Sequence, residues 1–129
     1  MMNIEKLACL LDDLVIAKTI YDLVKLGYNP TTLYRTLNSL VKYGFINITY
    51  IDNVRYYHLT GLGAELLKIL KKAIVNKLAE NLSMQGIKYK IWWGDNETRA
   101  ISPIVYVDRE ITLPVSIKKL IRVKIGFRE

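Results

Sequence analysis

Four polar side chains recur along residues 30 to 43 at positions that one face of an α-helix would bring together. They are Thr31, Arg35, Asn38 and Lys42, separated by four, three and four residues. Arginine can bond guanine O6 and N7, asparagine can bond adenine N6 and N7, and threonine can contact a base or a phosphate. These residue types suit contact with base edges in a DNA major groove, and Lys42, at the far end, suits a phosphate.

Acidic residues are missing from the segment around these side chains. From residue 30 to residue 51 the sequence contains neither Asp nor Glu, whereas a helix face that only contacts water usually mixes acids with bases. Thr31 and Thr32 lie near the expected helix N-terminus, where free N–H groups attract anions. Tyr34 lies between the polar and the apolar stripe. We therefore expect this face to meet a polyanion; the alternative is a face that is merely solvated.

The helix that carries these residues has sequence signals for its start and its end. Asn29 can cap it, Pro30 suits its first position, and Gly44 can end it. Behind the polar stripe, four apolar residues fall within about 100° of one another on a helical wheel. These are Leu33, Leu37, Leu40 and Val41. We expect a helix over residues 30 to 43 with this row in the core.

Two further helices are expected before this one. Residues 3 to 11 have Asn3 as a cap, and residues 13 to 26 repeat apolar residues at helical spacing. Gly27 suits the end of the second helix. The stretch "LGYNP" then reads as the short junction of a helix–turn–helix.

The stretch "FINITYIDNVRYYHL" predicts a β-hairpin, because Asp52 and Asn53 both tolerate the positive φ of a two-residue turn. The expected cross-strand pairs are Ile51 with Val54, Tyr50 with Arg55, Ile48 with Tyr57, and Ile46 with Leu59. In this register the base of the hairpin packs on helices and the tip stays polar.

Arg55 and Asn53 are the candidates for DNA contact in this hairpin. Arg55 suits a phosphate or the minor groove; the alternative is a cation–π contact with Tyr50 across the strands. Tyr56 and His58 share the other face, where either could touch DNA. His58 is the only histidine, and with no nearby cysteine or second histidine we expect a structural role for it rather than metal binding.

Thr60 can cap a long helix over about residues 61 to 82. Its apolar positions cover roughly 200° of a helical wheel, about twice what packing on one small domain needs. The surplus predicts a second contact surface, either the C-terminal region or the same helix of a second subunit. The candidates for dimerisation are Leu66, Leu70, Ile74, Leu78 and Leu82.

Residues 86 to 129 change character. "IKYKIWW", "IVYV" and "IRVKIGF" alternate, and "GDNE" resembles a turn, so we expect three or four antiparallel strands. Pro103 should lie on an edge or at a strand start, and "VSIKKL" is either strand or a short helix. The alternation puts Lys88, Lys90 and Trp92 on one face, which suits nucleic-acid stacking. The alternative for Trp92 and Trp93 is that one lies in the core and the other covers a dimer partner, a ligand or the long helix. In the last run Ile121, Val123, Ile125 and Phe127 face one way and Arg122, Lys124 and Arg128 the other. The alternative for the last run is a solvated basic face.

The composition fits a folded protein with an acidic partner. The 129 residues are 51% hydrophobic, and the formal net charge is +7. Residues 1 to 83 hold ten Lys/Arg and seven Asp/Glu, and residues 84 to 129 hold nine and five, so no basic tail exists. No apolar run reaches the length of a membrane span, and the start does not resemble a signal peptide. The single Cys9 should be a buried hydrophobe in a reducing cytoplasm.

Chemistry-bearing motifs are otherwise scarce. The acids Asp95, Asp108 and Glu110 could suggest a metal-dependent nuclease, but Thr112 stands where a lysine would be expected. The sequence contains no P-loop, dinucleotide fingerprint, Ser/His/Asp set or zinc spacing. We expect no catalytic residue, no metal ligand and no cofactor.

Two stretches resemble a known group of proteins. "NPTTLYRTLNSLVKYGFI" is similar to the recognition-helix region of PadR-like and MarR-like regulators, and "RYYHLTGLGAELLKIL" to their second wing strand and following helix. The resemblance covers about residues 13 to 75. It implies a winged helix–turn–helix that binds double-stranded DNA as a homodimer. By position, Thr31, Thr32, Tyr34, Arg35 and Asn38 match the groove-facing region, and Arg55 matches the wing.

The expected fold class is α+β, with a winged helix–turn–helix over residues 1–60, a long linking and dimerising helix over residues 61–85, and a small antiparallel β region over residues 86–129. The expected function is sequence-specific transcription regulation. The alternatives are a protein-interaction adaptor or antitoxin-type module whose protein partner binds residues 86–129, and a protein that coats DNA without regard to sequence.

Overall fold

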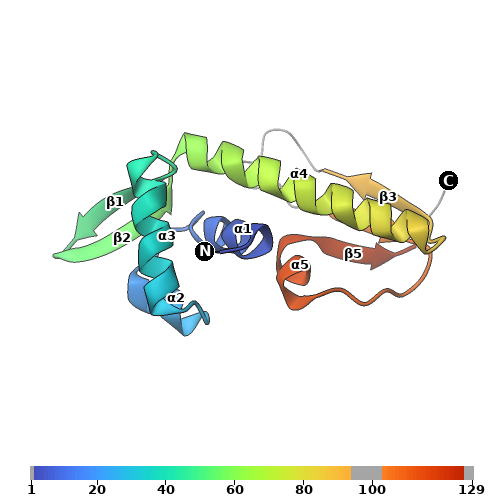
Figure 1. The fold of residues 1–129 in the computed structure, drawn as a ribbon, viewed down its shortest axis with the longest axis horizontal. Coiled ribbons are helices and arrows are strands. Elements are labelled where there is room, and N and C mark those ends of the chain that lie inside the picture. The colour runs from blue at the N-terminus through green and yellow to red at the C-terminus, as the bar shows by residue number, and fades with distance from the viewer. Residues whose placement is uncertain (1, 94–102, 127–129) are drawn as a thin grey trace. The chain divides into compact units, whose positions relative to one another are not determined.

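A computed structural model describes residues 2–93 and 103–126 of this mixed α and β protein (Figure 1). The chain forms two compact units, Met1–Leu67 and Lys68–Glu129. The expected turn at "GDNE", Asp95, Phe127 and Arg128 lie outside the described residues.

Three helices open the first unit: α1 (Ile4–Asp13), α2 (Ile20–Lys25) and α3 (Pro30–Lys42). The Oδ1 atom of Asn3 accepts from the backbone N of Lys6 at 2.8 Å, which confirms the expected cap of α1. Gly27 follows α2 with a φ of 105°, and Gly44 follows α3 with a φ of 82°, so both expected helix ends are confirmed.

The predicted single helix over residues 13 to 26 is wrong in its first half. Residues 14–19 are not helical, and α2 begins only after Thr19. Thr19 and Asp22 form a capping box, which fixes the helix start more strongly than the apolar spacing of Val15 and Ile16 indicated. Val15 and Ile16 are exposed.

The segment before α2 pairs with the hairpin instead. The backbone N of Lys18 donates to Tyr57 O at 2.9 Å, and Tyr57 N donates back to Lys18 O at 2.8 Å. Leu59 N donates to Leu14 O at 3.1 Å, so the chain between α1 and α2 runs along one edge of β2. These bonds satisfy backbone groups that a helix would otherwise have used.

The hairpin consists of β1 (Ile46–Ile51) and β2 (Val54–Leu59). All four predicted cross-strand pairs are observed, and Asp52 and Asn53 have φ values of 50° and 65°. The expected polar tip is wrong in part, because Ile51 and Val54 are exposed there. Ile51 and Val54 pair with each other on the face opposite Tyr50 and Arg55.

The core of the first unit forms where the apolar rows of its helices meet the base of the hairpin. Its fully buried side chains include Leu10, Leu11, Leu14, Leu23, Leu33, Leu37, Ile46 and Tyr57. Cys9 is also buried, as expected. This core sets which face of α3 is left outside.

The helix α4 (Gly61–Met84) begins in the first unit and continues into the second. Thr60 caps it as predicted: the backbone N of Gly63 donates to Thr60 Oγ1 at 3.0 Å. The Thr60 hydroxyl in turn donates to Gly44 O at 2.6 Å, which ties the helix start to the end of α3. The long helix expected over residues 61–85 is thus present as α4, and it contributes residues to both units. Within the described ranges, none of the helices combines the length and apolar character that crossing a membrane requires.

The second unit contains a three-stranded sheet in the order β3 (Tyr89–Trp92), β4 (Ile104–Val107), β5 (Arg122–Ile125). The pair β3–β4 is antiparallel, but β4–β5 is parallel, so the prediction of an antiparallel sheet is wrong for the last strand. The helix α5 (Val115–Leu120) explains the difference, because parallel strands need a crossover that is usually helical. "VSIKKL" is thus a helix, and Pro103 directly precedes β4.

Candidate nucleic-acid interface

The helix α3 separates its side chains into two faces as its sequence predicts. Leu33 and Leu37 are fully buried, and Leu40 is nearly so. The four residues of the polar stripe, Thr31, Arg35, Asn38 and Lys42, are all exposed. The buried row fixes the rotation of the helix, so the stripe faces away from the core of its own unit.

The N-terminus of α3 is held by its own cap. The Oδ1 atom of Asn29 accepts from the backbone N of Thr31 at 3.0 Å and from that of Thr32 at 3.2 Å. These two N–H groups therefore already have a partner, which corrects the expectation that they are free to attract a phosphate. Thr31 is exposed and offers its hydroxyl, whereas Thr32 is half-buried and its carbonyl accepts from Thr36 Oγ1 at 2.8 Å.

The turn before α3 is tied to α1 by a short hydrogen bond. The Tyr28 hydroxyl donates to Asp13 Oδ2 at 2.6 Å. Burial, and then this bond, raise the pKa of Tyr28 well above its usual value, so the phenol stays protonated and remains a donor. The bond anchors the junction that sets the direction in which α3 leaves the core.

Arg55 is positioned by aromatic side chains of the hairpin. Its guanidinium carbon lies 5.7 Å from the centre of the Tyr50 ring, and its Nη1 donates to the Tyr57 hydroxyl at 3.4 Å. Hydrogen bonding with Tyr57 and with Tyr50 raises the pKa of Arg55, so the cation is kept. The cation–π contact is therefore observed, and the arginine remains exposed.

Asn53, the second candidate for DNA contact in the hairpin, is exposed at the tip between Asp52 and the exposed Val54. On the opposite face Thr49 Oγ1 and His58 Nε2 are 2.8 Å apart, and His58 Nδ1 is 3.3 Å from Leu59 O. Both ring nitrogens of His58 thus have a partner within the chain, which supports the expected structural role. Tyr56 is half-buried on this side.

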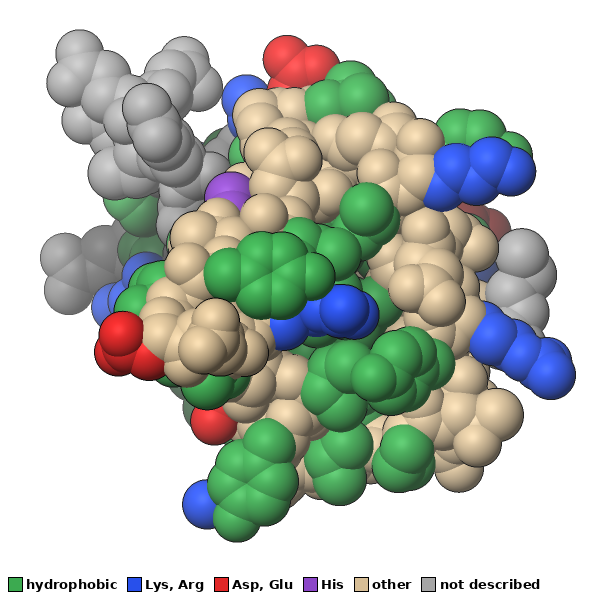
Figure 2. Space-filling view, turned by 90° about the vertical axis from the view of Figure 1, so that its left-hand side faces the viewer, with side chains coloured by type: hydrophobic (Ala, Val, Ile, Leu, Met, Phe, Trp, Pro, Cys, Tyr) green, Lys and Arg blue, Asp and Glu red, His purple; other side chains and the backbone are tan. Residues whose placement is uncertain are grey.

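Figure 2 shows the side of the first unit on which α2, α3 and the β1–β2 hairpin lie. Hydrophobic side chains gather across its middle with a Lys or Arg side chain between them, and further Lys or Arg side chains and the acidic side chains lie toward its edges. The exposed aromatic residues of the first unit include Tyr34 on α3 and Tyr50 on β1. A surface of this kind offers both charge and stacking area to a partner.

The charge is divided unevenly between the two units. Residues 1–67 contain six Lys/Arg and six Asp/Glu, whereas residues 68–129 contain thirteen and six. The excess of +7 therefore lies entirely in the second unit. Because the first unit has no net charge, any attraction of α3 for an anion must come from residues 30 to 51, which contain cations but no carboxylates.

The candidate dimerisation residues of α4 fall into two groups. Ile74, Leu78 and Leu82 are buried within the single chain, and Leu66 and Leu70 are half-buried. Ile69, which lies beside Leu66 and Leu70 at helical spacing, is 62% exposed. The apolar side chains that α4 leaves exposed thus include Ile69 and also Leu62, which is 50% exposed.

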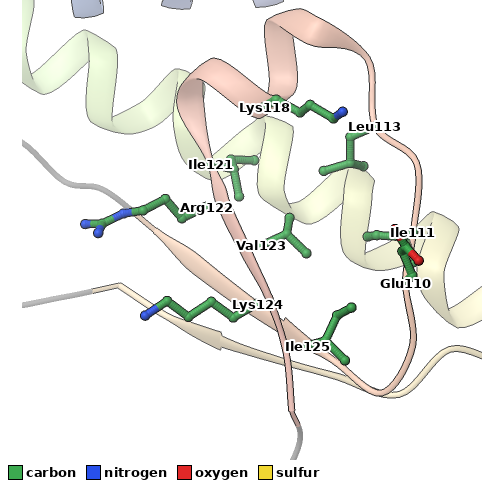
Figure 3. Close-up of a pocket in the computed structure, with 9 residues that line it drawn as sticks. All are labelled: Glu110, Ile111, Leu113, Lys118, Ile121, Arg122, Val123, Lys124 and Ile125. Carbon is green, nitrogen blue, oxygen red and sulfur yellow. The ribbon is translucent and has the colours of Figure 1, made fainter.

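The second unit brings together residues that sequence reasoning had treated as separate runs. The strand β4 lies between β3 and β5, so Lys90, Trp92, Arg122 and Lys124 share one sheet face. Tyr106 also lies on this face, although the sequence did not identify it as a candidate. The alternation of "IVYV" predicts that Tyr106 points away from Val105 and Val107, but it does not predict which strands lie beside β4. On the other side of β5, Ile121, Val123 and Ile125 line a pocket opposite Ile111 and Leu113 (Figure 3).

The acidic residues show no arrangement for metal chemistry among the described residues, where no group of three or more His, Cys, Asp or Glu could hold an ion. Asp108 Oδ1 accepts from Arg109 Nε at 3.0 Å, and this contact lowers the pKa of Asp108. Glu110 lines the pocket of Figure 3. Asp95, the third member of the nuclease hypothesis, lies outside the described residues.

Comparison with known proteins returned no matching family model, no matching curated protein and no matching solved structure.

Proposed function

We propose that the first unit is a winged helix–turn–helix of the PadR-like or MarR-like type, and that the protein is a sequence-specific, DNA-binding transcription regulator of the cytoplasm. In this proposal α3 enters the major groove and the β1–β2 hairpin is the wing beside it. The order of the elements supports this, as does the bridge between Lys18 and Tyr57, which pairs the segment before α2 with the edge of β2.

The observation that carries the proposal is the exposed stripe on α3. Thr31, Arg35, Asn38 and Lys42 all point away from a row of buried leucines, in a segment free of carboxylates. Arg35 and Asn38, near the middle of the helix, read bases; Lys42 and Thr31 contact phosphates. Arg55 and Asn53 at the wing contact the flanking backbone.

Dimerisation through α4 completes the proposal, because a pair of half-sites on DNA requires two copies of α3 at a fixed spacing. The residues that serve this contact are Leu66, Ile69 and Leu70, which one chain leaves exposed or half-buried. Ile74, Leu78 and Leu82 instead stabilise the second unit, where they are already buried.

Selection of bound sequences from a pool of random duplexes tests this function. The wild type should enrich one two-fold symmetric sequence, and its affinity for that sequence should fall steeply with salt. Arg35→Ala should relax the preference at one base pair of each half-site and cost about 1–3 kcal/mol. Lys42→Ala should weaken binding to all duplexes about equally.

Lys6→Ala is the matched control, since it removes one exposed lysine from α1 and leaves α3 and the wing intact. It should bind and select like the wild type. Enrichment of no sequence would rule out the specific regulator and favour coating of DNA, and an unchanged preference in Arg35→Ala would show that α3 does not read bases.

A further inference from the structure

The three-stranded sheet of the second unit has one face rich in cations and aromatic rings. Directly paired residues on neighbouring strands point to the same face, so the register defines two rows across the sheet. The first row is Lys90, Tyr106 and Lys124, and the second is Trp92, Ile104 and Arg122. We call the five residues Lys90, Trp92, Tyr106, Arg122 and Lys124 the cationic face.

The members of this face differ in burial from those of the opposite side. Lys90, Arg122 and Lys124 are exposed, Trp92 is 52% exposed, and Tyr106 is half-buried. Val105 and Val107, which alternate with them on β4, are buried. Figure 3 shows Arg122 and Lys124 extending from one side of β5, and Val123 from the other, beside the pocket. Ile104 in the second row is also buried, and Ile125 on the opposite side is 64% exposed, so the two sides of the sheet differ in charge throughout and in burial only at β4 positions such as Val105 and Val107.

The charge of this face is not cancelled by acids on the same strands. Among the described residues, the alternation of Ile104 and Tyr106 along β4 continues to the carboxylate of Asp108, just after the strand. Arg109 holds it through two hydrogen bonds, Nε to Oδ1 at 3.0 Å and Nη2 to Oδ2 at 3.3 Å. The unit as a whole has thirteen Lys/Arg against six Asp/Glu, so its partner should be an anion.

We propose that the cationic face binds single-stranded nucleic acid, an activity separate from the reading of duplex DNA by α3. Trp92 stacks on an unpaired base, and Lys90, Lys124 and Arg122 contact the phosphates on either side. Bases in a duplex are already stacked on each other and offer no ring to a flat sheet. An acidic protein segment would match the charges but would leave the exposed indole of Trp92 without a stacking partner.

Titration of the full-length protein with oligothymidylate and oligouridylate of about 15 nucleotides tests the proposal, with tryptophan fluorescence and the anisotropy of a labelled oligonucleotide as readouts. The wild type should bind with quenching of its fluorescence. Trp92→Ala should weaken binding about fivefold to a hundredfold, and Trp92→Phe, which keeps an aromatic ring, should retain most of the affinity. The oligonucleotide that binds with the higher affinity shows whether DNA or RNA is the preferred single strand.

Salt dependence separates the phosphate contacts from stacking. Lys90→Ala with Lys124→Ala should reduce the slope of log affinity against log salt by roughly 1.4, because each phosphate contact to a single strand contributes about 0.7. Lys72→Ala, which removes an exposed lysine of α4 in the same unit, should change neither slope nor affinity appreciably. Far-ultraviolet circular dichroism checks that each variant is folded.

Three results would overturn the proposal: affinity in Trp92→Ala and Trp92→Phe equal to the wild type, an equal loss in Lys72→Ala, or competition by polyglutamate as strong as by the oligonucleotides. The last would assign the face to an acidic protein partner. Arg35→Ala should bind the single strands as the wild type does. Failure of the single-strand proposal is thereby distinguished from failure of duplex recognition by α3.

Discussion

The carboxylate of Asp22 determines where a helix begins. The backbone N of Thr19 donates to Asp22 Oδ2, and Asp22 N donates to Thr19 Oγ1, both at 3.1 Å. The backbone bond from Thr19, followed by that from its side chain, lowers the pKa of Asp22 below its ordinary 3.8. Because α2 leads into the junction before α3, this cap helps to position the polar stripe.

The pH dependence of stability should reveal this capping box. A carboxyl whose pKa is lowered by folding stabilises the protein above its ordinary pKa, and that contribution is lost as the pH falls through the lowered value. We expect the free energy of unfolding to fall less steeply below about pH 4 in Asp22→Asn than in the wild type. Urea denaturation at several pH values measures the slope. Glu65→Gln, an exposed position outside the capping box, should keep the wild-type slope.

The element α3 shows what a sequence can predict locally. Asn29, Pro30 and the leucine row fix its start and rotation through short-range rules, and the structure agrees. The hairpin register was predictable for the same reason, since Asp52 and Asn53 fix the turn and each following pair is then determined. The start of α2 was missed because Val15 and Ile16 repeat at helical spacing, whereas the bridge of Lys18 to Tyr57 joins residues far apart in the sequence.

The contact between α4 and the start of the hairpin gives an element-scale prediction. A Cβ atom at Gly63 would collide with the carbonyl oxygen of Phe45, which also accepts from Thr60 N at 3.1 Å. Gly63→Ala should therefore destabilise the first unit by about 1–3 kcal/mol, because either the helix or the hairpin must move. Thermal and urea denaturation measure the change.

Gly61→Ala is the control for this effect, since a Cβ there meets no atom within 4 Å. Its stability should stay within about 0.5 kcal/mol of the wild type. An equally stable Gly63→Ala would mean that the helix does not approach the hairpin as closely as the structure shows.

At the scale of the whole molecule, the sequence predicted the types of element better than their association. The parallel pairing of β4 and β5 depends on the crossover through α5, and the cationic face depends on β4 lying between two runs that are 30 or more residues apart in the sequence. Periodicity within one strand gives the face of a side chain but not its neighbours. The concentration of net charge in the second unit likewise emerged only once the boundary near residue 67 was known.

The proposed dimer makes a prediction at the same scale. Ile69→Glu places a charge in the stripe with Leu66 and Leu70, and we expect the protein to become monomeric in sedimentation velocity while its thermal stability stays close to that of the wild type, because Ile69 is exposed. Because the variant no longer dimerises, its affinity for a symmetric duplex should also fall. Lys72→Gln, which changes the net charge by the same amount at an exposed position of α4, should remain dimeric. A dimeric Ile69→Glu would place the subunit contact elsewhere.

The most direct test of the central claim, that α3 faces DNA, is to map the duplex on the protein by NMR. The ¹⁵N-labelled full-length chain is titrated with the duplex that selection enriches, and the shift of each backbone amide is followed. We predict the largest changes at residues 31–42 of α3 and 52–55 of the hairpin tip, with little change along α1. Amides of α3 that shift no more than those of α1 at saturating duplex would contradict the account.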